Sequence, residues 1–147
     1  MSLRTYDSAD LHRLLAHRHP FLLVDRVDVI EPGRHVIGTK LLSAGEWWAK
    51  PDPMAAFPFS LALEALAQAS GALVEGLTDG AAGAIAYFMG VHHVRIRTAA
   101  HAGDRLTLDI ALIQWRRGLC RTRGVARLAD DAVVVTAHLT TIVRGTA

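Results

Sequence analysis

The stretch that most constrains the fold is FSLALEALAQASGALVEG, residues 59–76. Its apolar side chains run nearly all round a helix, so the helix has to be buried on most of its sides. Pro58 stands just before this stretch, where helices commonly start, and Ser60 is expected to cap it. The rest of the chain must therefore supply the surfaces that enclose one long central helix.

Most of the remaining segments have the patterns of strands. Residues 6–17 predict a short helix capped by Asp7 or Ser8. Residues 44–58, with Trp47 and Trp48 as anchors, predict a loop. Strands are expected as a pair within 17–43, joined by a turn at Pro32-Gly33, and at 85–97, 104–118, 119–129 and 132–145. This pattern is typical of the α+β class, with an antiparallel sheet curled around the long helix in a single domain, residues 1–147.

The composition excludes several classes of protein. The net charge of +2 is too weak to indicate nucleic-acid binding, and it fits an acidic partner protein at least as well. Cys120 is the single cysteine, so the chain has no internal disulfide, which favours a reducing, cytoplasmic compartment. The apolar stretches fit neither a signal peptide nor a membrane span, so we expect neither.

Up to Gly71, the long helix holds one acid, Glu64, and one amide, Gln68. They are four residues apart and therefore share one face of the helix. Among leucines and alanines a carboxylate is desolvated, which favours its neutral form, and acid–base catalysis uses carboxylates prepared in this way. The alternative is a glutamate that reaches the surface near the helix start, where the helix dipole favours it. The pattern alone leaves both interpretations open.

The histidines and arginines give weaker signals. His92 and His93 are adjacent on an expected strand, so they point to opposite faces and cannot chelate one metal ion; we expect no metal site. His17 and His19 lie at a helix-to-strand junction and are interpreted as loop caps. A basic hairpin, either solvated or facing an acidic protein, is formed by Arg116, Arg117, Arg121, Arg123 and Arg127.

Three blocks of the sequence resemble the FabZ-type β-hydroxyacyl-acyl-carrier-protein dehydratases, in the order and spacing of that family. They are HRHPFLLVDRV (17–27), LALEALAQASG (61–71) and YFMGVHHVRIRTAAHAGDRL (87–106). The resemblance implies a hotdog fold, in which a curled antiparallel sheet wraps a central helix. It also implies a dimer joined sheet edge to sheet edge, here near residues 84–93. The sites would lie in tunnels at that interface, which admit the acyl-phosphopantetheine arm of an acyl carrier protein, and no further cofactor is expected.

The implied chemistry is removal of water from a (3R)-hydroxyacyl thioester by a histidine and a carboxylate from opposite protomers. The family's carboxylate matches Glu64, with Gln68 as its usual companion. The family's histidine opens the pattern H-F-P-G-x-P-x-x-P-G, fourteen residues before the glutamate, where this chain has Lys50. No histidine lies between His35 and His92, so sliding the loop does not restore it. The chain keeps the carboxylate helix and has a degenerate histidine loop.

The resemblance also implies which residues face the substrate. Glu64 is the expected catalytic residue, and the expected substrate-binding residues are Gln68, Phe59, Ser60, Lys50, His19, Met89 and Gly90. The family often holds the peptide after its histidine in the cis form. In this chain that peptide is Lys50–Pro51, for which the cis form costs only about 0.5–1 kcal/mol, so a cis bond is expected there.

Three functions remain open at this stage. The first is a dehydratase subunit with half a site, whose histidine comes from a paralogous protomer in a heterodimer. The second is a subunit that binds the acyl carrier or stabilises a partner without catalysing a reaction. The third is a hotdog enzyme of another kind, such as a thioesterase, in which the helix carboxylate activates water. If the homodimer alone proves active, His19, His92 or His93 would be the replacement base.

Overall fold

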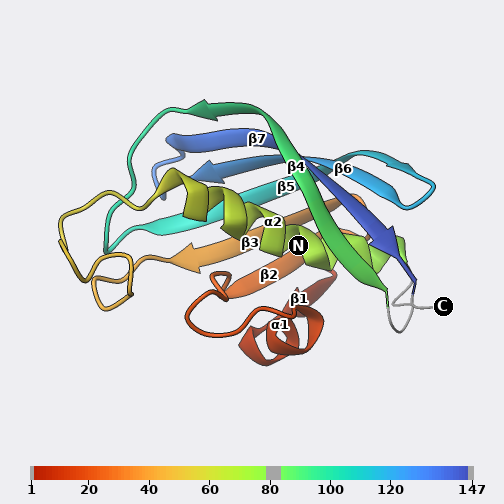
Figure 1. Cartoon of the computed structure of the whole chain (residues 1–147), viewed down its shortest axis with the longest axis horizontal. Helices are drawn as coiled ribbons and strands as arrows, with labels where there is room; N and C mark the ends of the chain where they lie inside the picture. The colour runs from red at the N-terminus through yellow and green to blue at the C-terminus, as the bar shows by residue number, and fades with distance from the viewer. Residues whose placement is uncertain (1, 79–83, 146–147) are drawn as a thin grey trace.

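A computed structural model describes residues 2–78 and 84–145 of the chain. It contains a short helix and a long one, and its strands belong to one sheet (Figure 1). The elements in chain order are β1 (Arg4–Tyr6), α1 (Ser8–Leu14), β2 (Arg26–Glu31), β3 (His35–Leu41), α2 (Phe59–Leu77), β4 (Ile85–Ile96), β5 (Arg105–Arg116), β6 (Leu119–Arg127) and β7 (Val133–Arg144).

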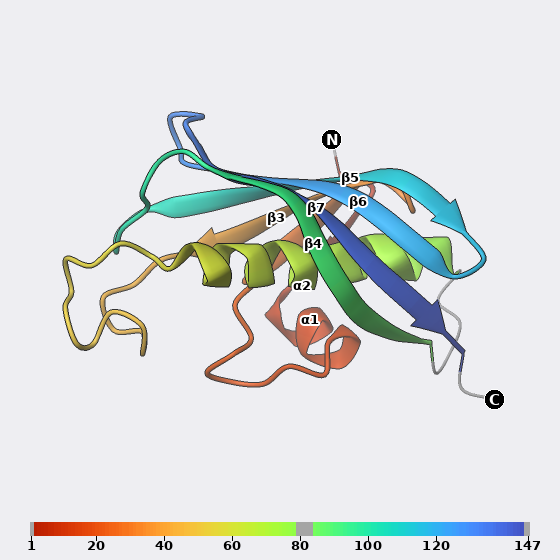
Figure 2. The same cartoon turned by 45° about the horizontal axis from the view of Figure 1, so that its top comes forward.

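The sheet has seven strands in the order β1-β2-β3-β5-β6-β7-β4, and every neighbouring pair is antiparallel. It curls around α2 and stays open, with β1 at one edge and β4 at the other (Figure 1). Helix α1 and the coil after it cover the side of α2 that faces away from the sheet (Figure 2). The predicted α+β class and hotdog arrangement are confirmed.

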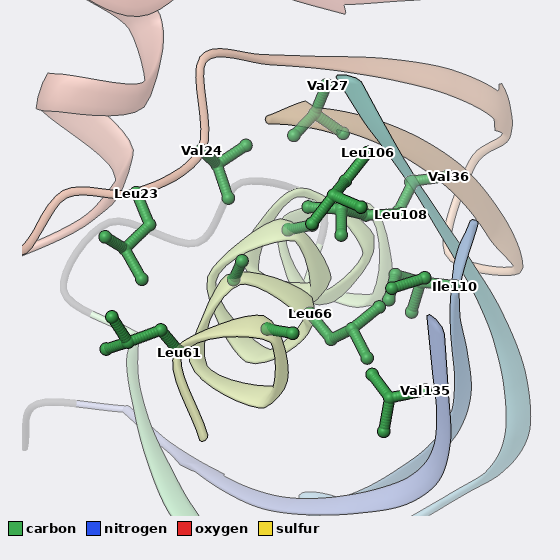
Figure 3. Close-up of a cluster of buried hydrophobic side chains, with 14 of the residues drawn as sticks. Leu23, Val24, Val27, Val36, Leu61, Leu66, Leu106, Leu108, Ile110 and Val135 are labelled. Atoms are coloured by element: carbon green, nitrogen blue, oxygen red, sulfur yellow. The ribbon is translucent and has the colours of Figure 1, made fainter. Parts of the chain in front are cut away.

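The core lies between α2 and the concave face of the sheet (Figure 3). Two glycines let strands approach the helix closely. A Cβ atom on Gly38 of β3 would lie 3.0 Å from the Cβ of Ala69, and one on Gly124 of β6 would lie 3.2 Å from Leu66. Since contacts this short force the neighbour to move, larger residues at either position would push the sheet away from α2. The largest fully buried apolar side chains include Leu11, Leu23, Leu66, Leu73, Leu106, Leu108, Ile110 and Leu139.

The two helices start differently. Asp7 caps α1 as predicted: its side chain accepts the Asp10 N–H, and the Asp10 side chain accepts the Asp7 N–H in return. The predicted Ser60 cap of α2 is wrong. Pro58 is the N-cap residue and has no side-chain hydrogen bond, while its carbonyl accepts the N–H groups of Leu61 and Ala62. A proline that already fixes the entry of the chain places Ser60 inside the first turn, too late to cap it.

Both tryptophans anchor the loop before α2, one inside the core and one on the surface. Trp48 is buried and meets the Phe57 ring edge to face, with ring centroids 5.0 Å apart. Trp47 is exposed and donates its indole N–H to the Pro20 carbonyl. The expected cis Lys50–Pro51 bond is wrong, because the cis peptide within the described residues is His19–Pro20, and trans is the lower-energy form of an X–Pro bond. Within the same residues, no helix is both long and apolar enough to cross a lipid bilayer.

Candidate functional site

Gln68 is the fixed point of the candidate site. Only 2% of its surface is exposed, and its side chain is fully engaged with the segment that follows α1. Its Oε1 accepts the Leu23 N–H at 2.8 Å, and its Nε2 donates to the Phe21 carbonyl and to Glu64 Oε1, each at 2.8 Å. These bonds join residues 45 and 47 positions apart in the sequence. We call residues 17–23 the strap, because they cross the polar face of α2 and satisfy its amide.

Glu64 is less buried than the sequence pattern suggested. Its side chain retains 26% of its exposure, although Ala65 and Leu66 beside it are fully buried. Glu64 and Gln68 both point toward the strap rather than toward the sheet, as their contacts with His17, Phe21 and Leu23 show. The carboxylate is therefore held by neighbouring donors, and water can still reach it.

His17 of the strap is the second contact of Glu64. Its Nε2 lies 3.2 Å from Glu64 Oε1, so the two form an ion pair when the imidazole is protonated. The side chain is 39% exposed, but its Nδ1 is buried and has no hydrogen-bond partner among the described residues. The interpretation of His17 as a loop cap is therefore incomplete. No local pattern of the sequence predicts the contact, because His17 and Glu64 are 47 positions apart.

A cavity of about 530 Å³ starts at His17 and extends between α1, the second half of α2 and the start of β4. Its far wall carries Tyr6 and Glu75, whose side chains share a hydrogen bond, and the Arg4 guanidinium lies 4.2 Å from the Tyr6 ring centroid. Burial and the bond to Glu75 both raise the pKa of Tyr6. His17 is the residue that connects this cavity to Glu64, because it lines the cavity and contacts the carboxylate.

The other predicted substrate-binding residues lie in four places: the start of α2, the loop before it, the strap and β4. Phe59 and Ser60 form the exposed first turn of α2, and Lys50 is exposed in the preceding loop. His19 lies in the strap, but unlike His17 it is exposed. Met89 and Gly90 lie on the edge strand β4, where the pairing with β7 shifts by one residue. Within one protomer, the structure brings Gln68 directly to Glu64; of the strap histidines, it brings His17 rather than His19.

The β4 histidines belong to another surface. His92 pairs with His138 of β7, and the residues on either side of His138, Ala137 and Leu139, are buried in the core. Because side chains alternate along a strand, His138 and His92 point to the face of the sheet opposite α2. The expectation that His92 and His93 point to opposite faces is wrong: His93 has a φ of 53° where the β4–β7 register shifts, and its ring centroid lies 5.1 Å from that of His138, on the same face. Burial, followed by the charges of His93 and Arg121, lowers the pKa of His138. Neither His92 nor His93 serves Glu64 of the same protomer.

The described residues hold no group of three or more histidine, cysteine, aspartate or glutamate side chains that could bind a metal ion. The site is thus a clamped carboxylate with an imidazole beside it. Such a pair can accept, donate or store a proton.

Comparisons with known proteins show the family of the chain. The profile of the FabA-like domain matches residues 15–138. The 3-hydroxyacyl-[acyl-carrier-protein] dehydratase FabZ of Thermoanaerobacter pseudethanolicus is 35% identical over 137 residues, which cover 90% of this chain and 94% of the relative. The FabZ of an Acidovorax species is 37% identical over 133 residues, covering 83% and 89%.

Solved structures show the same fold. The dehydratase heterocomplex ApeI:P of Xenorhabdus doucetiae contains a chain that matches with a TM-score of 0.75 and 22% identity, covering 92% of this chain and 91% of that one. A hypothetical thioesterase of Streptococcus pneumoniae, solved with coenzyme A, matches with a TM-score of 0.67 and 16% identity, covering 94% and 97%.

Proposed function

The chain belongs to the FabA-like family, together with the FabZ 3-hydroxyacyl-[acyl-carrier-protein] dehydratases, and from that premise we propose that it is a dehydratase subunit with half of a composite site. As a single hotdog domain over residues 1–147, it binds (3R)-hydroxyacyl thioesters carried on the phosphopantetheine of an acyl carrier protein, in fatty-acid or polyketide biosynthesis. A paralogous subunit supplies the histidine. A cytoplasmic location fits the free, buried thiol of Cys120.

The observation that carries this proposal is the Gln68-clamped Glu64 on a helix whose preceding loop has Lys50 in place of the family's histidine. In the elimination, a base removes a proton from C2 of the acyl chain, and the electron pair left on C2 forms the C2–C3 double bond as the C3–O bond breaks. The departing hydroxyl takes the electrons of the C3–O bond, and an acid protonates it to give water. One chain offers the carboxylate for one of these tasks. An exposed lysine is protonated near pH 7 and is unsuited to act as the base.

The edge strand β4 supports the subunit arrangement. Outside its pairing with β7 it has no strand neighbour among the described residues, and it exposes large apolar side chains along its length: Ile85, Tyr87, Phe88, Met89, Val94 and Ile96. A long, unpaired, apolar edge of this kind is expected to pair with another chain. We propose that pairing along residues 84–93 forms a homodimer or a heterodimer. The structural neighbour described as a dehydratase heterocomplex offers a precedent for the latter.

The deciding experiment is a dehydration assay on β-hydroxyacyl-carrier protein, with the chain alone and mixed with a paralogue that has an intact H-F-P-G loop. We expect the chain alone to be very weak, since one missing acid–base group costs about 10²–10⁴-fold. The mixture should be active, and Glu64→Ala should abolish that activity, whereas Glu31→Gln on the exposed end of β2 should not. The proposal is wrong if the chain alone turns over at a rate typical of enzymes, about 1–10³ per second.

A thioesterase is the second candidate, and the 26% exposure of Glu64 favours it, because a water molecule can reach the carboxylate. The S. pneumoniae neighbour is described as a hypothetical thioesterase, although at 16% identity it supports the fold rather than the activity. Hydrolysis of acyl-coenzyme A by the chain alone, lost in Glu64→Ala, would favour this function. If neither reaction occurs in any mixture while the acyl carrier still binds, the chain is a non-catalytic carrier-binding or stabilising subunit.

A further inference from the structure

We propose that His17 positions Glu64 and supplies its proton, so that the carboxylate can act as the acid of the composite site. This inference rests on the proposed function, since it assigns Glu64 the task of protonating the departing hydroxyl. It concerns a residue of the same protomer, and it adds to the base that the partner subunit is proposed to supply.

The first argument is the geometry of the carboxylate. Glu64 Oε1 receives the Gln68 amide at 2.8 Å and faces His17 Nε2 at 3.2 Å. The second distance is that of an ion pair without an aligned hydrogen bond. In proteins without bound substrate, catalytic hydrogen bonds are often long or poorly aligned and tighten when the substrate binds. With Gln68 almost fully buried, the position of Glu64 is fixed from one side by an amide that cannot titrate and from the other by a ring that can.

His17 is held in place by hydrogen bonds within and around the strap. The Arg18 guanidinium donates to the Leu15 and His17 carbonyls at 2.9 and 2.7 Å, and the Arg18 carbonyl accepts the Phe21 N–H at 2.8 Å. The Trp47 indole holds the Pro20 carbonyl at 3.1 Å. Nδ1 of His17 is buried, so the ring presents Nε2 to Glu64. His17 therefore acts through Glu64 and is a positioning residue rather than a group that attacks the substrate.

Glu64 must hold a proton before it can act as an acid, and His17 can supply one. A glutamic acid in ordinary surroundings is ionised near pH 7 and has no proton to give, whereas an imidazole changes charge between about pH 5 and 8. In the proposed cycle, the partner's histidine takes the C2 proton and the double bond forms. Glu64 gives its proton to the departing hydroxyl, which leaves as water. The Glu64 carboxylate then takes the Nε2 proton of His17, and His17 is reprotonated from the solvent as the partner's histidine releases its proton.

Other charged groups face the same cavity and have to be considered. Asp10 and Arg13 come from α1, Arg4 and Tyr6 from β1, and Glu75 from α2. They pair among themselves: Arg13 with Asp10 at 2.8 Å, and Glu75 with Tyr6 and Arg4. The cavity residues at the start of β4 and just before it, Ala84, Ile85 and Ala86, do not titrate. Glu64 is thus the ionisable side chain in direct contact with His17.

A kinetic test uses the mixture with the histidine-bearing paralogue. His17→Gln keeps an N–H donor but cannot titrate, and His17→Phe has neither property. We expect His17→Gln to lower kcat about tenfold or more at pH 7.5 and much less at pH 5, where the solvent can protonate Glu64 directly, with KM little changed. His17→Phe should lose more at both pH values. His12→Gln, an exposed histidine on α1, is the matched control and should follow the wild type. Equal losses at pH 5 and pH 7.5 for His17→Gln would overturn the inference.

A second test needs no activity, and it separates this inference from the proposed function. Ring ¹⁵N NMR of the full chain, with its eight histidines assigned by substitution, reports which ring nitrogen carries the proton. We expect the His17 ring signals to change in Glu64→Gln, while the His12 signals stay constant. If every mixture is inactive yet this change appears, the proposed function fails and the His17–Glu64 contact stands. Unchanged His17 signals in Glu64→Gln would refute the inference whatever the activity.

Discussion

The polar pair of α2 and the loop directly before that helix are built in opposite ways. Gln68 and Glu64 are tied to the strap by hydrogen bonds and a close imidazole. In the loop, residues 44–58, Lys50 and Met54 are exposed, and the histidine expected from the family pattern is absent. The scaffold of the carboxylate is therefore complete within one protomer. The loop touches it only through Trp47, which contacts Pro20 and Phe21 of the strap, so stability and catalysis can be changed separately.

The largest expected effect breaks the loop at its buried anchor. Trp48→Ala should lower the free energy of unfolding by about 3–5 kcal/mol, because it removes a large buried side chain packed on Phe57. Trp47→Ala, at an exposed position with one hydrogen bond and a stacked contact to Phe21, should cost only about 1 kcal/mol. Urea denaturation of both variants measures the difference. Equal losses would mean that the outer side of the loop is as firmly packed as the inner side.

The next effect concerns the polar pair. Gln68→Leu should cost about 2–4 kcal/mol of unfolding free energy, because it leaves the Leu23 N–H and the Phe21 carbonyl without their partner in a buried place. Gln114→Leu, at an exposed position of β5, is the matched control and should stay within about 0.5 kcal/mol of the wild type. Chemical denaturation followed by tryptophan fluorescence gives both values. A neutral Gln68→Leu would show that the strap is held to α2 by apolar contacts alone.

The ionisation of the buried Cys120 thiol is expected to depend on how well the sheet covers the core. Burial raises the pKa of the Cys120 thiol to about 11, and since the thiolate is the reactive form, the folded protein should be alkylated about 100-fold more slowly at pH 8 than the urea-unfolded chain. The thiol of the unfolded chain ionises first as pH rises. The stability linked to Cys120 is therefore complete below about pH 9 and is lost toward pH 11. Rapid alkylation of the native protein would reveal an opening of the sheet near β6.

The smallest expected effect on stability is that of restoring a histidine at position 50 of the loop. Lys50→His should change the free energy of unfolding by less than about 0.5 kcal/mol, since Lys50 is exposed and forms no side-chain hydrogen bond or ion pair with residues 2–78 and 84–145. In the homodimer it should raise dehydratase activity only if the pocket keeps its shape, and Phe59 stands where the family pattern has glycine. Lys50→His and the double variant Lys50→His/Phe59→Gly should therefore be assayed side by side. A large gain from the single variant would show that Phe59 does not obstruct the site.

Much of the architecture could be read from the sequence, because it depends on local patterns. The helix expected at 59–76 is found at Phe59–Leu77, and the strand expected at 85–97 is found at Ile85–Ile96. β1 was missed, because its three residues carry too short a pattern and are defined by their pairing with Val27–Val29 of β2. The Ser60 cap was wrong because serine is favoured only at the N-cap position, and in this helix Pro58 occupies that position.

In the candidate site, the sequence alone was enough to place Glu64 and Gln68 side by side on α2. Helical periodicity puts Glu64 and Gln68 on one face whatever the rest of the chain does, and the structure shows them bonded. Which side chains of the strap lie opposite this pair depends on the tertiary structure. The contact between His17 and Glu64 spans 47 positions of the sequence and depends on how the strap crosses α2, which no local pattern encodes. Likewise, strand alternation predicts that His92 and His93 point to opposite faces, but the irregular register of β4 with β7 brings the His93 ring to His138, the direct partner of His92.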